Sequence, residues 1–168
     1  RTTGWEFQLS YKGSIGREIL YNVGFNVSDY KSKVMSLNFN EEKSLGYLYE
    51  GMMAGEIWGY RWDGFYTVDD FKDTATWQLK DGVTGITGSS PRPGDFKYKN
   101  LRDNEYSDED TGMINSGKGT ANNPGDMTVI GNSTPRFQYG FNFNISYKGF
   151  DLGIMIQGIG KRDYAAIN

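Results

Sequence analysis

The sequence predicts an all-β fold built from long antiparallel strands, and three observations support this prediction. Residues 137–147 alternate strictly between apolar and polar side chains, and residues 5–12 and 21–28 repeat the pattern. Successive side chains of a strand point to opposite faces, so each run has one apolar and one polar face. Aromatic residues make up 15% of the chain, and 23 glycines accompany only 4 prolines, which suits strands joined by turns.

The clearest hairpin is predicted in residues 134–160. Its first strand carries an apolar face made of Phe137, Tyr139, Phe141, Phe143, Ile145 and Tyr147. Lys148-Gly149 interrupts the alternation as a turn, and a second apolar series follows at Phe150, Leu152, Ile154 and Ile156. Each strand has about eleven residues, roughly the length with which a tilted strand crosses a bilayer.

A second hairpin is predicted near the N-terminus, with a short turn at residues 13–18. The stretch between the two hairpins has no comparable alternation. We expect short strands around a turn at residues 56–60 and 64–66, and one short helix within residues 68–77. Residues 93–131 are polar and rich in glycine, so they are predicted to be loop.

The chain therefore divides into a hairpin at residues 1–29, a loop lobe at 30–133, and a hairpin with the start of a further loop at 134–168. Short turns on one side and a long excursion on the other are typical of outer-membrane barrels. Four strands cannot close a barrel, and open strand edges are not tolerated in lipid. Periodicity alone leaves two alternatives, a section of a larger membrane barrel or a soluble β-sandwich.

Composition removes several classes of chemistry. The chain has no cysteine and no histidine, so disulfides, Cys or His metal sites and histidine-dependent catalysis are excluded. The net charge is -3, and nothing indicates nucleic-acid binding. Paired carboxylates such as Asp69-Asp70 have no fixed separation, and we expect no enzymatic activity. Because the sequence starts within a strand pattern, without Met or a signal sequence, we expect it to be an internal piece of a longer protein.

Several strings extend the argument, and they span nearly the whole chain. They are residues 1–6, 21–29, 49–52, 55–60, 63–66, 93–98, 130–140, 148–152 and 157–164. In this order they resemble the C-terminal barrel section of TonB-dependent outer-membrane transporters of the SusC/RagA type. One departure concerns residues 100–110, which have the acidic density of the family's loop but not its spacing.

The resemblance implies a transmembrane β-barrel segment of about four membrane strands, arranged as two hairpins with a large extracellular lobe. It implies a location in the bacterial outer membrane and import of an oligosaccharide or peptide ligand. The implied partners are a SusD-like surface lipoprotein and the TonB complex, which would act through an N-terminal part outside this chain. The alternative function is a soluble or surface β-rich module that binds glycans.

Candidate residues follow from these expectations. In a barrel, the apolar face from Phe137 to Tyr147 would contact lipid, and four aromatic residues near strand ends suit an interfacial girdle: Trp5, Tyr11, Tyr30 and Tyr147. Aromatic residues of the lobe could stack on a ligand or form a small core beneath the loop, namely Trp58, Tyr60, Trp62, Tyr66 and Trp77. Four carboxylates could hold Ca²⁺ or simply be solvated, namely Asp103, Asp108, Asp110 and Asp126. No other cofactor is expected.

Overall fold

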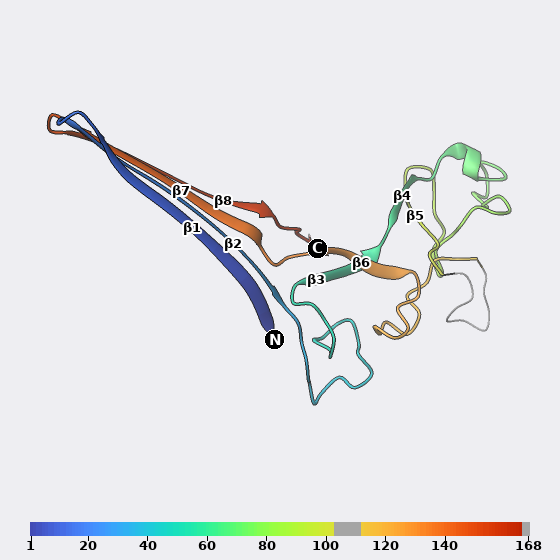
Figure 1. Cartoon of the computed structure of the whole chain (residues 1–168). Coiled ribbons are helices and arrows are strands. Elements are labelled where there is room, and N and C mark those ends of the chain that lie inside the picture. Colours follow the sequence, from blue (N-terminus) through green and yellow to red (C-terminus); the bar gives the residue numbers. More distant parts are fainter. Residues whose placement is uncertain (103–111, 166–168) are drawn as a thin grey trace. The chain divides into compact units, whose positions relative to one another are not determined.

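A computed structural model describes residues 1–102 and 112–165, and it confirms the prediction of an all-β protein (Figure 1). The strands are β1 (Thr2–Ile15), β2 (Ile19–Ser32), β3 (Glu56–Tyr60), β4 (Trp62–Phe65), β5 (Phe96–Tyr98), β6 (Met127–Asn132), β7 (Arg136–Tyr147) and β8 (Phe150–Lys161). One 3-10 turn, η1, covers Val68–Asp70. None of the helical segments in the described residues has the length and apolar character needed to span a membrane.

The four long strands form one antiparallel sheet in the order β1-β2-β7-β8. Both predicted hairpins are confirmed, and β2 joins them by pairing with β7 from Ile19↔Tyr147 to Ser28↔Gln138. The sheet is open in the described residues, with β1 and β8 as its edges, so these residues do not close a barrel (Figure 1).

The register gives this sheet one apolar face and one polar face. Leu9 pairs with Phe25, Phe25 with Phe141, and Phe141 with Ile156, so one row of four apolar side chains crosses all four strands. The next row toward the N-terminus of β1 begins at Gln8 and is polar, since strand neighbours alternate between faces. We call the first surface the apolar face: Trp5, Phe7, Leu9, Tyr11, Tyr21, Val23, Phe25, Val27, Tyr139, Phe141, Phe143, Ile145, Tyr147, Phe150, Leu152, Ile154 and Ile156.

The second surface, the polar face, carries mainly hydroxyl, amide and charged groups, with Leu20, Met155 and Ile159 as apolar exceptions. Its polar residues are Glu6, Gln8, Ser10, Lys12, Asn22, Asn26, Ser28, Gln138, Asn142, Asn144, Ser146, Asp151 and Gln157. The apolar face does not form a protein core in the described residues. Leu9 is 61% exposed and Ile156 is 53% exposed. Among the residues that the structure describes, the buried hydrophobic side chains come from other parts of the chain: Tyr49, Tyr66, Phe71 and Ile114.

Two glycines inside the strands are explained by tyrosine rings on the apolar face. The ring of Tyr21 lies over its pair partner Gly13, where an added Cβ would meet the ring at 2.5 Å. The ring of Tyr139 lies over its partner Gly158 in the same way. Glycine weakens a strand because it has nothing to pack, and an aromatic neighbour that covers the bare backbone restores contact.

The two hairpin turns lie at the same end of the sheet. Lys148 and Gly149 have φ angles of 47° and 84°, the paired positive values of a type I′ turn. The first turn is shorter than predicted, because β1 continues through Gly13 to Ile15 and only residues 16–18 connect the strands. The ammonium group of Lys148 lies 3.2 Å from the carboxylate of Glu18, so an ion pair connects the two turns.

Contacts divide the chain into two compact units. The sheet unit comprises Arg1–Lys33, Met53–Gly55 and Asn132–Asn168, and the lobe unit comprises Val34–Met52 and Glu56–Gly131. The lobe unit holds two small sheets, β3-β6 and β4-β5.

Three expectations for the lobe unit need correction. The short strands at 56–60 and 64–66 exist as β3 and β4, but they pair with β6 and β5 rather than around a shared turn. The expected helix is only the single turn η1. Residues 93–131, predicted as loop, contain β5 and most of β6. Such short strands form because they pair with segments that are distant in the sequence. Their own residues therefore show no periodicity from which they could be predicted.

Candidate functional site

The predicted lipid-contact residues lie along one surface of β7. Tyr139 is 41% exposed and Tyr147 is 44% exposed, whereas the three residues between them on this face, Phe141, Phe143 and Ile145, are half-buried by neighbouring strands. Phe137 is 46% exposed and has a φ of 53°, so it leaves extended geometry near the start of β7. The apolar face thus presents a continuous hydrophobic surface without polar interruption between Tyr139 and Tyr147.

The length of this surface suits a bilayer. A rise of ~3.3 Å per residue separates Tyr139 and Tyr147 by ~26 Å along the strand, or about 20 Å of depth at a tilt of ~40°. Trp5 and Tyr147 lie in the end rows of the apolar face, as a girdle requires, whereas Tyr11 lies in an inner row. The prediction that Tyr30 belongs to the girdle is wrong. Tyr30 pairs with Gly4 and therefore lies with Ser28 on the polar face.

Asparagine side chains lie flat across the polar face. Asn142 covers Gly24 and Asn26 covers Gly140, and in each pair a Cβ on the glycine would collide with the amide. A shallow depression of about 460 Å³ lies beside them, lined by Ser28, Gln138 and Gln157 among others. This face is suited to contact with water or with polar protein groups rather than with lipid.

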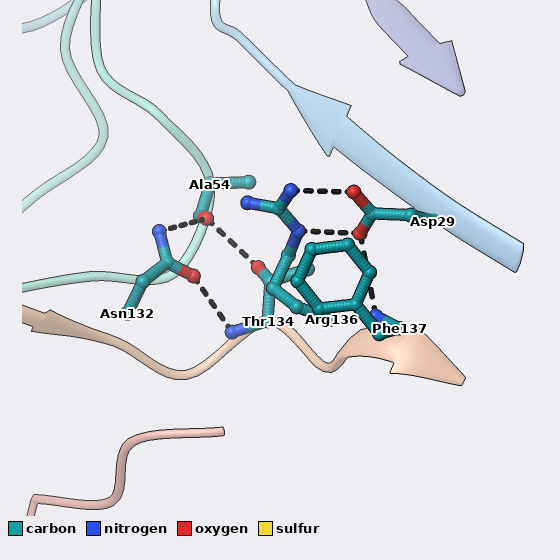
Figure 2. Close-up of polar contacts among 6 residues, drawn as sticks. All are labelled: Asp29, Ala54, Asn132, Thr134, Arg136 and Phe137. Carbon is teal, nitrogen blue, oxygen red and sulfur yellow. Dashed lines mark hydrogen bonds and ion pairs between the residues drawn. The ribbon is translucent and has the colours of Figure 1, made fainter. Parts of the chain in front are cut away.

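At the end of the sheet away from the turns, a charged pair connects β2 and β7 (Figure 2). Arg136 donates from Nη2 to Oδ2 of Asp29 at 2.5 Å and from Nε to Oδ1. The side chains are only 25% and 8% exposed, respectively. The Phe137 backbone N–H also reaches Oδ1 of Asp29, and the Arg136 guanidinium carbon lies 5.3 Å from the centre of the Phe137 ring. Asp29 therefore holds both the side chain and the backbone at the start of β7.

Next to this pair, the segment Met53–Gly55 is held between the ends of β2 and β7 (Figure 2). The Ala54 carbonyl accepts from Thr134 Oγ1 at 2.8 Å and from Asn132 Nδ2 at 3.1 Å. The Ala54 N–H donates to the Ser32 carbonyl at 2.8 Å. Asn132 Oδ1 accepts from the Thr134 N–H at 2.8 Å. We call Asp29, Ala54, Asn132, Thr134 and Arg136 the junction.

Sequence reasoning did not identify the junction as a site. Asp29 and Arg136 are separated by 107 residues, so no local spacing connects them. The sequence did contain a signal that could have pointed to this pair. Asp29 and Arg136 are both charged residues that border a long alternating run. A charge at that place needs a partner or water, and the pairing of β2 with β7 supplies the partner.

The five aromatic ligand candidates of the lobe do not form one site. Tyr66 is 2% exposed and donates its hydroxyl to the Thr84 carbonyl at 2.7 Å, so it belongs to the core. Burial raises the pKa of the Tyr66 phenol. Trp58 and Tyr60 are half-buried in β3, where Trp58 donates to the Glu56 carboxylate at 3.3 Å. These three side chains fit the alternative interpretation, a small core beneath a long loop.

Trp62 and Trp77 remain open to solvent in different places. Trp62 is 58% exposed and packs edge-on against Phe65, whose ring is tilted against that of Phe96 with ring centres 5.4 Å apart. Trp77 is half-buried and lies edge-on to Phe71 at 5.4 Å. Trp77 also lines an open groove of about 550 Å³, which it shares with Gln78, Ser89, Arg92 and other residues.

The cation candidates are only partly described. Asp103, Asp108 and Asp110 lie outside the described residues. Asp126 is fully buried, and both of its oxygens already accept hydrogen bonds. Oδ1 accepts from the Leu101 and Arg102 N–H groups at 2.8 and 3.1 Å, and Oδ2 accepts from the Asn115 N–H at 2.9 Å. Among the described residues no group of three or more acidic side chains could hold a metal ion.

Comparison with known proteins gives one informative similarity. No family model matches the chain. The chain is 25% identical to TonB-dependent receptor P3 of Formosa agariphila over 92% of its own length, and it spans 14% of the length of that protein. The similarity covers both the sheet unit and the lobe unit. It supports a relation of this chain to TonB-dependent receptors, without separating the SusC/RagA type from the others.

Proposed function

We propose that this chain forms part of the wall and of the extracellular lobe of a TonB-dependent importer in the bacterial outer membrane. One observation carries the proposal: the apolar face crosses four strands in register and stays exposed instead of packing into a core. A soluble sandwich would bury that face against a second sheet. A barrel wall leaves it open to lipid, and the similarity to a TonB-dependent receptor supports this alternative.

The connections suggest an orientation. In outer-membrane barrels the short turns face the periplasm and the long connections face outward. The turns at residues 16–18 and at Lys148-Gly149 would then be periplasmic, and the lobe unit would lie outside the cell. The polar face would line the barrel interior.

The ligand and partners follow from the resemblance to the SusC/RagA type. The importer would take up an oligosaccharide or a peptide together with a SusD-like surface lipoprotein. Energy would come from the TonB complex, acting on parts of the importer outside these residues. A calcium ion at the acidic stretch around residues 103–110 stays part of the proposal, and the hydrogen bonds of Asp126 argue for a structural role of that carboxylate.

Cysteine labelling in living cells tests the proposal, because this segment has no cysteine of its own. Single substitutions Ser116→Cys, Glu18→Cys and Phe143→Cys would be introduced into the intact natural chain that contains these residues. A membrane-impermeant maleimide should label position 116 in intact cells and position 18 only after the outer membrane is permeabilised. Position 143 should react only with a lipid-soluble maleimide.

The unmodified parent chain is the control for background labelling. Equal labelling of positions 143 and 116 by the impermeant reagent would contradict the membrane assignment and favour the soluble glycan-binding module. Labelling of position 18 in intact cells would contradict the orientation alone.

A further inference from the structure

We propose that the groove around Trp77 binds an oligosaccharide that carries an anionic group, either a carboxylate or a sulfate. The inference deepens the proposed function and rests on it, because the groove must face the outside of the cell to meet such a ligand. The groove belongs entirely to the lobe unit, and we define it by its described lining: Thr76, Trp77, Gln78, Leu79, Val83, Gly85, Ser89, Ser90, Pro91, Arg92, Gly112 and Met113.

The lining has the mixture of groups that a sugar requires. Trp77 is a half-buried aromatic residue of the lining, and Gln78, Ser89 and Ser90 are exposed residues that carry amide and hydroxyl groups. No hydrogen bond within the described residues engages the side chains of these three polar residues, so their donors and acceptors are available to a ligand. A pyranose ring presents an apolar face to an aromatic ring and hydroxyl groups at its rim, and both kinds of contact are offered here.

Arg92 gives the groove its charge preference. It is the single charged residue among the described lining residues. Its backbone N–H donates to Asp95 Oδ2 at 2.8 Å, while its exposed guanidinium has no carboxylate partner in the described part of the chain. A guanidinium binds a carboxylate or sulfate through paired, charge-assisted hydrogen bonds, so an anionic substituent on the sugar is the complementary group.

The backbone at Trp77 indicates that its position is imposed. Trp77 has a φ of 54°, a left-handed conformation that bulky residues rarely adopt. The ring is held edge-on against Phe71, which is 4% exposed, with an interplanar angle of 85°. Residues held in rare backbone conformations concentrate at binding sites, because the surrounding structure must stabilise them.

A carbohydrate fits this groove better than a peptide does. None of the described lining residues lies in a strand or a helix, so the groove offers no strand edge to which an extended peptide could add. It also lacks the deep apolar pockets that anchor peptide side chains, since its lining is mixed and its mouth is open. An acidic peptide is therefore the competitor to be excluded by experiment.

Titration calorimetry on the intact natural chain, purified in detergent, tests the inference. The probes are tetragalacturonate, its fully methyl-esterified form, a sulfated galactan tetrasaccharide and tetraglutamate. Arg92→Gln removes the charge, and Trp77→Asn removes the ring while tolerating the left-handed backbone. Arg61→Gln and Phe39→Asn are matched controls, since both residues are exposed and lie outside the groove.

We expect at least one anionic glycan to bind, with affinity reduced about tenfold in Arg92→Gln and in Trp77→Asn and unchanged in the controls. If the carboxylate form binds, the methyl ester should bind about tenfold more weakly. Thermal unfolding of each variant checks that it folds. If Trp77→Asn does not fold, Arg92→Gln still tests the inference. The preference of tetragalacturonate or of the sulfated glycan identifies which anion the groove takes.

Three results would overturn the inference: no binding of either anionic glycan, binding unaffected by both groove variants, or tighter binding of tetraglutamate through the same residues. Labelling at position 116 in intact cells, measured in parallel on the Ser116→Cys variant, separates the two proposals. Surface labelling without glycan binding overturns the groove assignment alone, whereas loss of the outer-membrane location overturns the proposed function as well.

Discussion

Arg136 binds the carboxylate of Asp29 with two guanidinium nitrogens, although 107 residues separate the two positions. The pair lies where β2 and β7 stop pairing, next to the segment Met53–Gly55 (Figure 2). Asp29→Asn should therefore loosen the junction, because the guanidinium loses its charged partner and one of the two acceptor oxygens is replaced by an amide donor. We expect amide hydrogen exchange at Thr134 and Phe137 to become about tenfold faster.

A double-mutant cycle with Arg136→Gln isolates the pair. If the two substitutions act through one interaction, the double variant should exchange little faster than either single variant. Additive effects would show that the two side chains stabilise the junction independently. Exchange in the middle of β7 serves as the internal control, since Phe141 pairs on both sides irrespective of the junction.

Asp126 should be a structural carboxylate of the lobe unit. Asp126→Ala would leave the N–H groups of Leu101, Arg102 and Asn115 without their acceptor. The expected destabilisation of the lobe unit is roughly 3 kcal/mol, and Asp126→Asn should cost less because one acceptor oxygen remains. Chemical denaturation followed by tryptophan fluorescence measures both values, with the exposed Glu42→Ala as the control. Equal stability of Asp126→Ala and the parent would refute this role.

Asp70 should make the lobe unit sensitive to acid. Its Oδ2 accepts from the Thr67 N–H at 2.7 Å, and its Oδ1 accepts from Lys97 Nζ at 3.1 Å. These contacts, the Thr67 backbone bond first, hold the pKa of Asp70 below its ordinary value of 3.8. The ionised form is therefore favoured by folding, and its contribution is complete above about pH 4 and lost as the pH falls through the lowered pKa.

Thermal unfolding of the lobe unit between about pH 2 and pH 6 checks this sign. Asp70→Asn should lower the melting temperature at neutral pH and flatten the acid limb of the profile. Asp69→Asn, on the neighbouring exposed residue, should leave the profile unchanged. A parent and an Asp70→Asn variant with the same acid limb would show that Asp70 is not the group responsible.

The sequence was sufficient to predict the long strands because their signal is local. Alternation defines the two faces of β7 over consecutive residues, and Lys148-Gly149 marks its turn without reference to anything distant. The same logic failed at Tyr30, where the continuing alternation was too weak to assign the face. The structure assigns Tyr30 through its pairing with Gly4.

Features that depend on distant pairing were not accessible from the sequence. β6 supports β3 from a stretch with no periodicity, and the Asp29–Arg136 pair exists only because β2 and β7 are neighbours. The groove around Trp77 was likewise hidden, since its lining extends from Thr76 to Met113. Trp77 was a candidate from the sequence because it is aromatic. Nothing in the sequence indicated that Arg92 lies in the same groove.

Two adjacent residues on opposite faces of β7 test whether the apolar face contacts lipid. Phe141 lies in the apolar row with Phe25 and Ile156, and Asn142 lies beside it on the polar face. Arginine on the lipid face near the bilayer centre costs about 2–4 kcal/mol, whereas interior positions of a barrel tolerate charge. The two variants differ by one position in the chain and introduce the same side chain.

The deciding measurement is the free energy of unfolding of the intact chain in lipid vesicles, for Phe141→Arg and for Asn142→Arg. A lipid-facing wall predicts that Phe141→Arg loses about 2–4 kcal/mol while Asn142→Arg loses about 1 kcal/mol or less. Equal losses, or a larger loss for Asn142→Arg, would contradict the assignment of the apolar face to the membrane.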